Sequence, residues 1–172
     1  MFISKIIIKQ TEKSDLPNIL GMWNNGETMK YVGFPNGLGW TMNDMNKWFE
    51  ELQAQKEYVH CSIYADDVGF CGETSYETHE LEHITRNMGL EIKLLPVAQG
   101  KGIASYALKY AIDMAYNSGS FDVVHAEPHP ENEAAIKLYK KLGLKFAERP
   151  QYLHPADTYM ELDLTEWHNY RY

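Results

Sequence analysis

A glycine-containing turn near the middle of the chain is the residue pattern that most directly suggests chemistry. Residues 90–112 read LEIKLLPVAQGKGIASYALKYAI, and the run of β-forming and aliphatic residues ends at Pro96. A turn from Gln99 to Gly102 follows, and small and apolar residues then recur at helical spacing. Glycine allows a sharp turn and close approach of the backbone to a ligand. The pattern predicts a strand, a tight loop and a helix N-terminus, where unpaired amides and the helix dipole favour phosphate or pyrophosphate.

The loop by itself does not identify a ligand. It lacks the G-x-x-x-x-G-K-[ST] spacing of a Walker loop and the G-x-G-x-x-G fingerprint of a dinucleotide-binding domain. Lys101 adds a positive charge to the loop. The competing interpretation is a tight strand-to-helix turn without any ligand, and the loop alone leaves both interpretations open.

Composition favours a single globular domain over residues 1–172. The chain is 44% hydrophobic and 13% aromatic, as folded proteins are. Its formal charge of −8 argues against a nucleic-acid-binding protein and is compatible with a cationic small substrate, although solubility alone also explains it. The N-terminal residues MFISKIIIKQ have no signal-peptide or membrane-span pattern, so we expect a cytoplasmic protein without membrane contact. Cys61 and Cys71 are expected to be free, buried thiols.

The hydrophobic periodicity predicts the element order β-α-α-β-β-β-α-β-α-β-β, an α/β fold with a mixed sheet between helices. The expected strands cover residues 3–8, 58–65, 68–77, 84–95, 122–127, 144–148 and 158–164. The expected helices cover about 14–24, 41–55, 102–118 and 132–142, with Ser14, Thr41 and Asn132 as N-caps. Residues 24–40 are expected to form an irregular, substrate-lining loop. A right-handed crossover makes the strands on either side of the helix at 102–118 parallel.

The sequence His79-Glu80-Leu81-Glu82-His83 matches the zinc-binding pattern H-E-x-x-H. That chemistry requires a helix, because two histidines four residues apart share a face only there. The segment falls between two strand-like runs, and no third ligand follows at a family spacing. We therefore expect a solvated acidic turn and no metal site.

A second pattern lies downstream, in residues 131–146, which read ENEAAIKLYKKLGLKF. It places Asn132 at a helix N-terminus, Tyr139 two turns later and Gly143 at the end of the helix. Taken singly, Asn132 is explained as an N-cap and Tyr139 as a core aromatic. Their combination with the glycine loop at this separation favours a shared ligand site.

At this point the chain resembles the GNAT superfamily of N-acetyltransferases. The first family signature, [Q/R]-x-x-G-x-[G/A], is matched by Gln99, Gly102 and Ala104. The second, N-x-x-A-x-x-L-Y-x-x-x-G-[FL], is matched by Asn132, Ala135, Leu138, Tyr139, Gly143 and Leu144. The specific resemblance covers residues 90–147, and the element order fits nearly the whole chain. It implies a GNAT-like fold with a splayed central sheet, acetyl-CoA as co-substrate without a metal, and a primary amine as acceptor.

The resemblance also implies roles for individual residues. The backbone of Ile92, Lys93 and Leu94 would pair with the pantetheine arm of CoA, and Asn132 would bind the same arm. The loop residues that would hold the CoA pyrophosphate are Gln99, Gly100, Lys101, Gly102, Ile103, Ala104 and Ser105. Tyr139 would be the general acid that protonates the departing thiolate, and a backbone amide of the strand would polarise the thioester carbonyl.

The base and the acceptor stay open. Glu127 matches the base of some relatives that acetylate protein N-termini, although Pro128 replaces the more usual valine after it. The alternatives are a water chain, Glu73, Glu91, His129 and His154. By the same resemblance, residues 23–35 and 152–159 would flank the amine, and their acids and aromatics suit a polyamine, an aminoglycoside-like compound or a protein N-terminus. A non-catalytic acyl-CoA-binding or sensing module on the same fold is the competing function. The oligomeric state also stays open, with a homodimer among the options.

Overall fold

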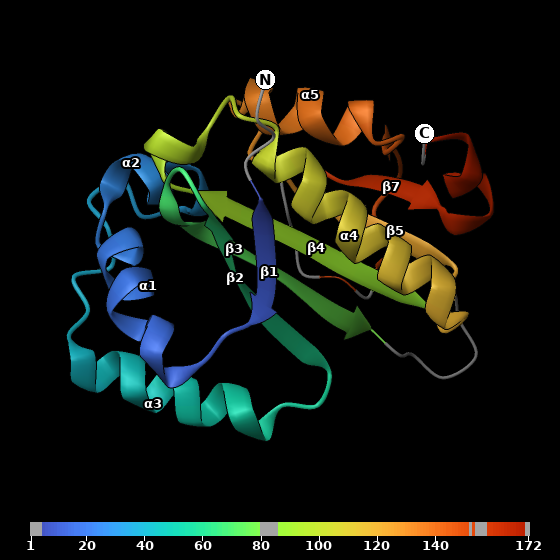
Figure 1. Cartoon of the computed structure of the whole chain (residues 1–172). Helices are drawn as coiled ribbons and strands as arrows, with labels where there is room; N and C mark the ends of the chain where they lie inside the picture. The colour runs from blue at the N-terminus through green and yellow to red at the C-terminus, as the bar shows by residue number, and fades with distance from the viewer. Residues whose placement is uncertain (1–4, 80–85, 152, 154–157, 171–172) are drawn as a thin grey trace. The chain divides into compact units, whose positions relative to one another are not determined.

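The computed structural model describes residues 5–79, 86–151, 153 and 158–170. Its strands form an open, mixed, seven-stranded sheet in the order β1-β2-β3-β4-β5-β7-β6. The strands are β1 (Ile6–Gln10), β2 (Tyr58–Ala65), β3 (Gly69–His79), β4 (Asn87–Leu94), β5 (Val123–Ala126), β6 (Lys145–Phe146) and β7 (Met160–Asp163). The α-helices are α1 (Leu16–Trp23), α2 (Gly26–Met29), α3 (Met42–Ala54), α4 (Ile103–Ser118) and α5 (Glu133–Lys141) (Figure 1). The predicted fold class is thereby confirmed.

The chain divides into two compact units. The first unit consists of residues 1–75 and 92–107, and the second of residues 76–91 and 108–172. β3, β4 and α4 each contribute residues to both units, because the division falls within these elements. The expectation that residues 1–172 form one functional domain stays a prediction.

In the first unit, helices pack on both faces of the strands. β1 pairs antiparallel with β2, from Ile6 opposite Ala65 to Gln10 opposite Cys61. The first turns of α4 pack against one face, where the buried side chains are those of Ile63, Ala65, Cys71, Leu94, Ala98, Ile103 and Ala107. The other face packs against α1, α2 and α3 through Phe70, Leu95 and the buried residues Leu16, Ile19, Met22, Trp23, Met29 and Met45. Alternation along each strand explains why neighbours such as Leu94 and Leu95 belong to different layers.

The predicted boundaries in the first unit need two corrections. Ser14 does not cap α1, because a short 3₁₀ helix, Lys13–Asp15, precedes it and the side chains of Glu12 and Asp15 form the capping box. Residues 24–40 are not wholly irregular, since Asn25 caps α2 by accepting a hydrogen bond from the Glu27 amide. The predicted capping box of Thr41 and Asp44 at the start of α3 is confirmed.

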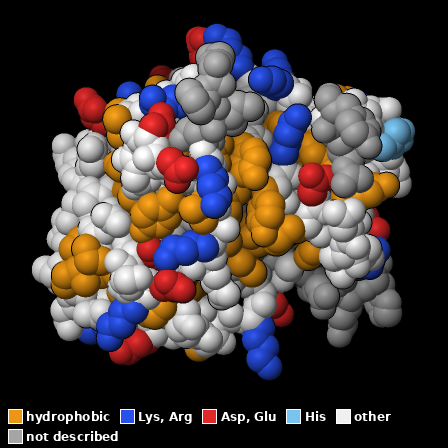
Figure 2. Space-filling view, viewed as in Figure 1, with side chains coloured by type: hydrophobic (Ala, Val, Ile, Leu, Met, Phe, Trp, Pro, Cys, Tyr) orange, Lys and Arg blue, Asp and Glu red, His pale blue; other side chains and the backbone are white. Residues whose placement is uncertain are grey.

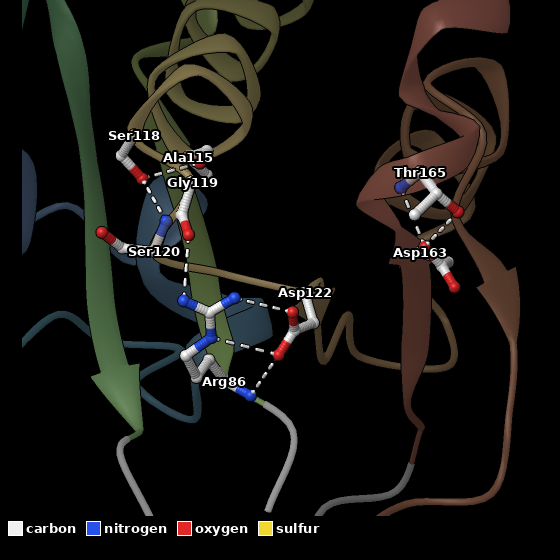
Figure 3. Close-up of polar contacts among 8 residues, drawn as sticks. All are labelled: Arg86, Ala115, Ser118, Gly119, Ser120, Asp122, Asp163 and Thr165. Carbon is white, nitrogen blue, oxygen red and sulfur yellow. Dashed lines mark hydrogen bonds and ion pairs between the residues drawn. The ribbon is translucent and has the colours of Figure 1, made fainter.

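In the second unit, β5 pairs parallel with β4 and antiparallel with β7, and β6 pairs antiparallel with β7. The predicted parallel crossover is thereby confirmed, although β6 covers only Lys145–Phe146. Gly119 ends α4 with a left-handed φ of 64°. Just beyond it, Arg86 pairs with both carboxylate oxygens of Asp122 and donates to the Gly119 carbonyl, which joins the entrances of β4 and β5 to the end of α4 (Figure 3).

The helix α4 is amphipathic over its whole length. Its buried face consists of Ile103, Ala107, Leu108, Ala111, Ile112 and Ala115. Hydrophobic side chains also reach the surface of the molecular face that carries α4 (Figure 2). Tyr106, Tyr110 and Met114 of α4 are exposed. The 3.6-residue period thus separates a buried face of alanine, isoleucine and leucine from an exposed face that carries tyrosine and methionine.

Two further sequence predictions concern cysteines and metal. Cys61 and Cys71 are free and buried, as predicted. His79 ends β3, while residues 80–83 of the H-E-x-x-H match lie outside the described residues. Among the residues that the structure describes, no cluster of three histidine, cysteine or acidic side chains is arranged to hold a metal ion. In the same residues, no helix combines the length and apolar character that crossing a bilayer requires.

Candidate active site

The glycine loop connects β4 to α4 in the first unit. Gly100 and Gly102 have left-handed φ values of 74° and 79°, which residues with a Cβ adopt only at a cost. A Cβ atom added to either glycine would meet no atom within 4 Å. The glycines are therefore needed for the backbone conformation, and the open space beside them suits an approaching phosphate group.

The remaining loop residues hold this turn in place. The Gln99 side chain donates from Nε2 to the Leu94 carbonyl at 3.2 Å, which ties the loop to the end of β4. Lys101 Nζ lies 3.7 Å from Asp67 Oδ2 in an exposed ion pair. Ile103 is buried and Ala104 packs against the same core, so these two side chains anchor the start of α4. Ser105 is half-buried in the first turn of α4.

The end of β4 has the arrangement that an added strand of ligand would need. The β4–β5 register runs from Asn87 opposite Val123 to Gly89 opposite His125, whereas β4 continues to Leu94. The side chains of Ile92 and Leu94 pack into the α4-side core. The backbone that follows is held by β3, because the Leu95 amide donates to the Cys71 carbonyl at 2.9 Å. These features fit a pantetheine arm running along Ile92–Leu94.

A buried polar network occupies the opposite face of the same strands. Glu73 is only 2% exposed, and its carboxylate lies 3.0 Å from Lys93 Nζ and 3.1 Å from His60 Nε2. The Trp23 indole donates to both carboxylate oxygens, at 2.9 Å and 3.0 Å. On the far side of the ring, His60 Nδ1 lies 2.7 Å from the Thr11 hydroxyl. The sequence reasoning missed this network, although polar residues inside otherwise buried strands were a signal for it.

The network decides the charge of Glu73. Burial alone raises the pKa of this carboxyl, but the ammonium of Lys93, together with His60 and Trp23, outweighs burial and lowers the pKa from 4.5 to about 2. His60 Nε2 lies 3.1 Å from the carboxylate, although the angles of this contact are not those of a hydrogen bond. A carboxylate with so low a pKa is a poor acceptor for the proton of an ammonium. Glu73 is therefore ill suited to be the general base.

The second signature lies in the second unit, on α5. Asn132 caps this helix, because its Oδ1 accepts a hydrogen bond from the Ala135 amide at 3.1 Å. The cap uses the side-chain oxygen, and among the described residues the Nδ2 group has no hydrogen-bond partner. Asn132 can therefore serve as cap and as donor to a ligand at once. Tyr139 lies two turns along α5 and is 5% exposed.

The candidate bases differ in their surroundings. Glu127 is exposed at the end of β5, and the following Pro128 is buried, with its carbonyl accepting a hydrogen bond from the Thr158 hydroxyl. Glu91 is half-buried in β4. His129 Nδ1 accepts a hydrogen bond from the Glu131 amide at 3.2 Å. His154 lies outside the described residues.

A second buried network also escaped the sequence reasoning. His125 Nδ1 lies 2.7 Å from Asn87 Oδ1, and its ring stacks on Tyr159 at a centroid distance of 5.3 Å. The Tyr159 hydroxyl accepts from Asn87 Nδ2 and donates to Glu161 at 2.9 Å. Because an amide oxygen is only an acceptor, His125 carries its proton on Nδ1. The network joins side chains of β4, β5 and β7 through hydrogen bonds and ring stacking.

Comparisons with known proteins identify the family. A model of the acetyltransferase (GNAT) domain matches residues 5–145. Spermidine N(1)-acetyltransferase from Escherichia coli K12 is 27% identical over 139 residues, covering 79% of this chain and 70% of that protein. The E. coli O157:H7 protein of the same name matches equally.

Solved structures agree on the fold. Vibrio cholerae spermidine N-acetyltransferase, in complex with CoA and spermine, superposes with a TM-score of 0.78 at 18% identity, covering 95% of this chain and 98% of that one. A GNAT-family acetyltransferase from Streptococcus pneumoniae gives a TM-score of 0.71 at 17% identity, covering 92% and 99%. The chain therefore belongs to the GNAT family and is an acetyl-CoA-dependent N-acetyltransferase.

Proposed function

We propose that the protein transfers the acetyl group of acetyl-CoA to a primary amine of a polyamine such as spermidine or spermine. The observation that carries the donor half is the open glycine loop at the head of α4, within the region matched by the family model. The acceptor is supported by relatives named for spermidine acetylation and by the formal charge of −8, which favours approach of a cation. The reaction fits the cytoplasm, since the free cysteines suit a reducing compartment.

On the donor side, we assign the pyrophosphate to the loop from Gln99 to Ser105. The amides that follow Gly100 and Gly102 would donate to it, assisted by the start of α4. The backbone of Ile92, Lys93 and Leu94 would hydrogen-bond to the pantetheine arm as a neighbouring strand does. Asn132 Nδ2 would donate to a carbonyl of the same arm.

In the reaction, the amine nitrogen forms a bond to the thioester carbonyl carbon, and the bond from that carbon to sulfur breaks. The amine must first lose a proton, because an ammonium has no free electron pair. A β4 backbone amide would stabilise the oxyanion, and Tyr139 would give its hydroxyl proton to the departing thiolate. The second proton released by the nitrogen, as it becomes an amide, would restore the Tyr139 hydroxyl. The burial of Tyr139 suits this role, since it limits competition from water.

For the base we propose Glu127, acting directly or through water. Its carboxylate lies at the exposed end of β5, where a cationic amine can reach it from solvent. The low pKa of Glu73 favours Glu127 over Glu73 for this role. The conservative variant E127Q should then lower kcat most strongly at low pH, where the free amine is scarcest.

The test is a thiol-release assay with acetyl-CoA and a panel of primary amines. The panel would contain spermidine, spermine, a short diamine, an aminoglycoside and a peptide with a free N-terminus. We expect kcat/KM to be largest for the polyamines. A larger value for the aminoglycoside or the peptide would contradict the acceptor assignment, and no release with any amine would favour a non-catalytic CoA-binding module.

A further inference from the structure

A chain of buried polar side chains crosses the first unit from the end of β1 to β4. It starts at Ser62 and Thr11, whose hydroxyls lie 2.9 Å apart, and continues through His60 and Glu73 to Lys93. His60 and Glu73 are almost completely buried, and the Lys93 side chain is 11% exposed. The reaction described above assigns no role to these side chains.

The energetics suggest that this ion pair serves more than stability. A buried salt bridge gains little net free energy, because desolvation offsets the attraction of the charges, and apolar residues of similar volume often replace such pairs without loss. Loss of a single partner is costly, because a charge then stays buried without compensation. A buried pair therefore favours the one backbone arrangement in which the two charges meet.

The backbone that this ion pair fixes is the β4 segment Ile92–Leu94, which we assign to binding of acetyl-CoA. Three successive residues of β3 hold it. Cys71 accepts the Leu95 amide, Gly72 lies against the Lys93 carbonyl, and Glu73 binds the Lys93 ammonium. A Cβ atom on Gly72 would come within 2.0 Å of the Lys93 carbonyl oxygen, so the two backbones approach more closely than a side chain allows. A slip of one residue would turn Lys93 toward the apolar layer beneath α4.

We propose that Glu73 and Lys93 form a positioning pair that fixes the register and twist of the donor-binding segment Ile92–Leu94. His60 and Trp23 orient the Glu73 carboxylate, and Thr11 orients His60. Both residues act through the β4 backbone, so their effect falls on binding of acetyl-CoA. This inference rests on the proposed function of Ile92–Leu94.

The test compares CoA affinity, steady-state kinetics and urea unfolding in four variants: K93M, E73Q, the double variant E73Q/K93M and K93R. The matched control is the exposed ion pair Lys145–Glu166, with an N–O distance of 2.9 Å, examined as K145M and E166Q. Isothermal titration with CoA gives Kd, and the acetyl-transfer assay separates KM for acetyl-CoA from kcat. The double variant leaves no buried charge without a partner. If the single variants K93M and E73Q do not fold, the comparison of the double variant and K93R with the wild type is sufficient to test the proposal.

We expect the double variant to bind CoA about tenfold more weakly and to show a similar rise in KM for acetyl-CoA. This change is smaller than the roughly hundredfold loss of reaction rate that a misplacement of about 1 Å can cause in an active site. K93R, which keeps the cation, should lose less CoA affinity than K93M, and both control variants should stay within about threefold of the wild type. A double variant with wild-type CoA affinity, or a K93R loss as large as that of K93M, would overturn the inference. Absence of CoA binding by the wild type would instead refute the proposed function, so the two failures are distinguishable.

Discussion

Replacing Glu73 with glutamine removes one buried negative charge while nearly preserving the shape of the side chain. The pKa of Glu73 falls from 4.5 to about 2 on folding, and each pKa unit corresponds to about 1.4 kcal/mol of differential stability. Relative to its protonated form, the ionised carboxylate therefore adds about 3 kcal/mol to the free energy of unfolding at pH 7. Because Glu73 is completely buried, screening by solvent reduces this figure little. We expect E73Q to be less stable than the wild type by about this amount.

The pH dependence gives the prediction its specificity. A carboxyl group whose pKa is lower in the folded state stabilises the protein fully above its unfolded pKa and loses that contribution as pH falls toward the folded pKa. For Glu73 the window runs from about 4.5 down to about 2. At pH 3 the remaining contribution is about 1 kcal/mol. The stability difference between wild type and E73Q should therefore fall by more than half between pH 7 and pH 3.

Urea unfolding of both proteins at pH 7, 5, 4 and 3 measures this difference, with E166Q as the exposed control. Midpoints and slopes have to be compared, because a change of slope would signal a change in the denatured state. A difference between wild type and E73Q that stays constant from pH 7 to pH 3 would refute the assignment of Glu73 as an ionised, paired carboxylate. If the stability difference between wild type and E166Q changed with pH by the same amount, burial of Glu73 would not be the cause of its effect.

Three further predictions follow from single residues. Gly72→Ala should lower the free energy of unfolding by more than about 3 kcal/mol, because the added Cβ would clash with the Lys93 carbonyl. The control Gly69→Ala, where φ is 79° and the space is open, should lower it by about 1–2 kcal/mol, and equal losses in urea unfolding would contradict the close approach of Gly72. Asn132→Ala should lower the free energy of unfolding by about 1 kcal/mol and should also weaken CoA binding, whereas Asn132→Ser should keep the helix cap and lose only the amide donor. Wild-type CoA affinity in the serine variant would show that Asn132 acts only as a helix cap. Tyr139→Phe should lower kcat by about a hundredfold with CoA affinity unchanged, and an unchanged kcat would remove Tyr139 from the mechanism.

Local signals in the sequence predicted most of the fold. Thr41 with Asp44, Gly119 and Asn132 mark helix ends by side-chain or backbone preferences that act within a few residues, and each is found in its predicted role. The wrong N-cap at Ser14 has a local cause as well. The Asp15 carboxylate accepts the Glu12 amide and thereby favours a preceding 3₁₀ turn.

The polar residues of the two buried networks were visible in the sequence, but their pairing was not, because each network joins residues that are distant in sequence. His60 meets Glu73 and Lys93 only after β2, β3 and β4 have aligned, and His125 meets Asn87 only in the parallel pair of β4 and β5. The sequence shows each as an isolated polar residue in a strand, and its partner depends on register. The glycine loop was predictable for the opposite reason, since its turn and helix start lie within a few residues of each other.

The central claim is that this GNAT-family protein acetylates a primary amine of a polyamine. The most direct measurement is mass spectrometry with fragmentation of spermidine after incubation with acetyl-CoA and the purified protein, with Tyr139→Phe as the matched control. We predict spermidine carrying one acetyl group on a primary amine, with far less product from the variant. Unmodified spermidine, or an acetyl group on the secondary amine, would contradict the claim.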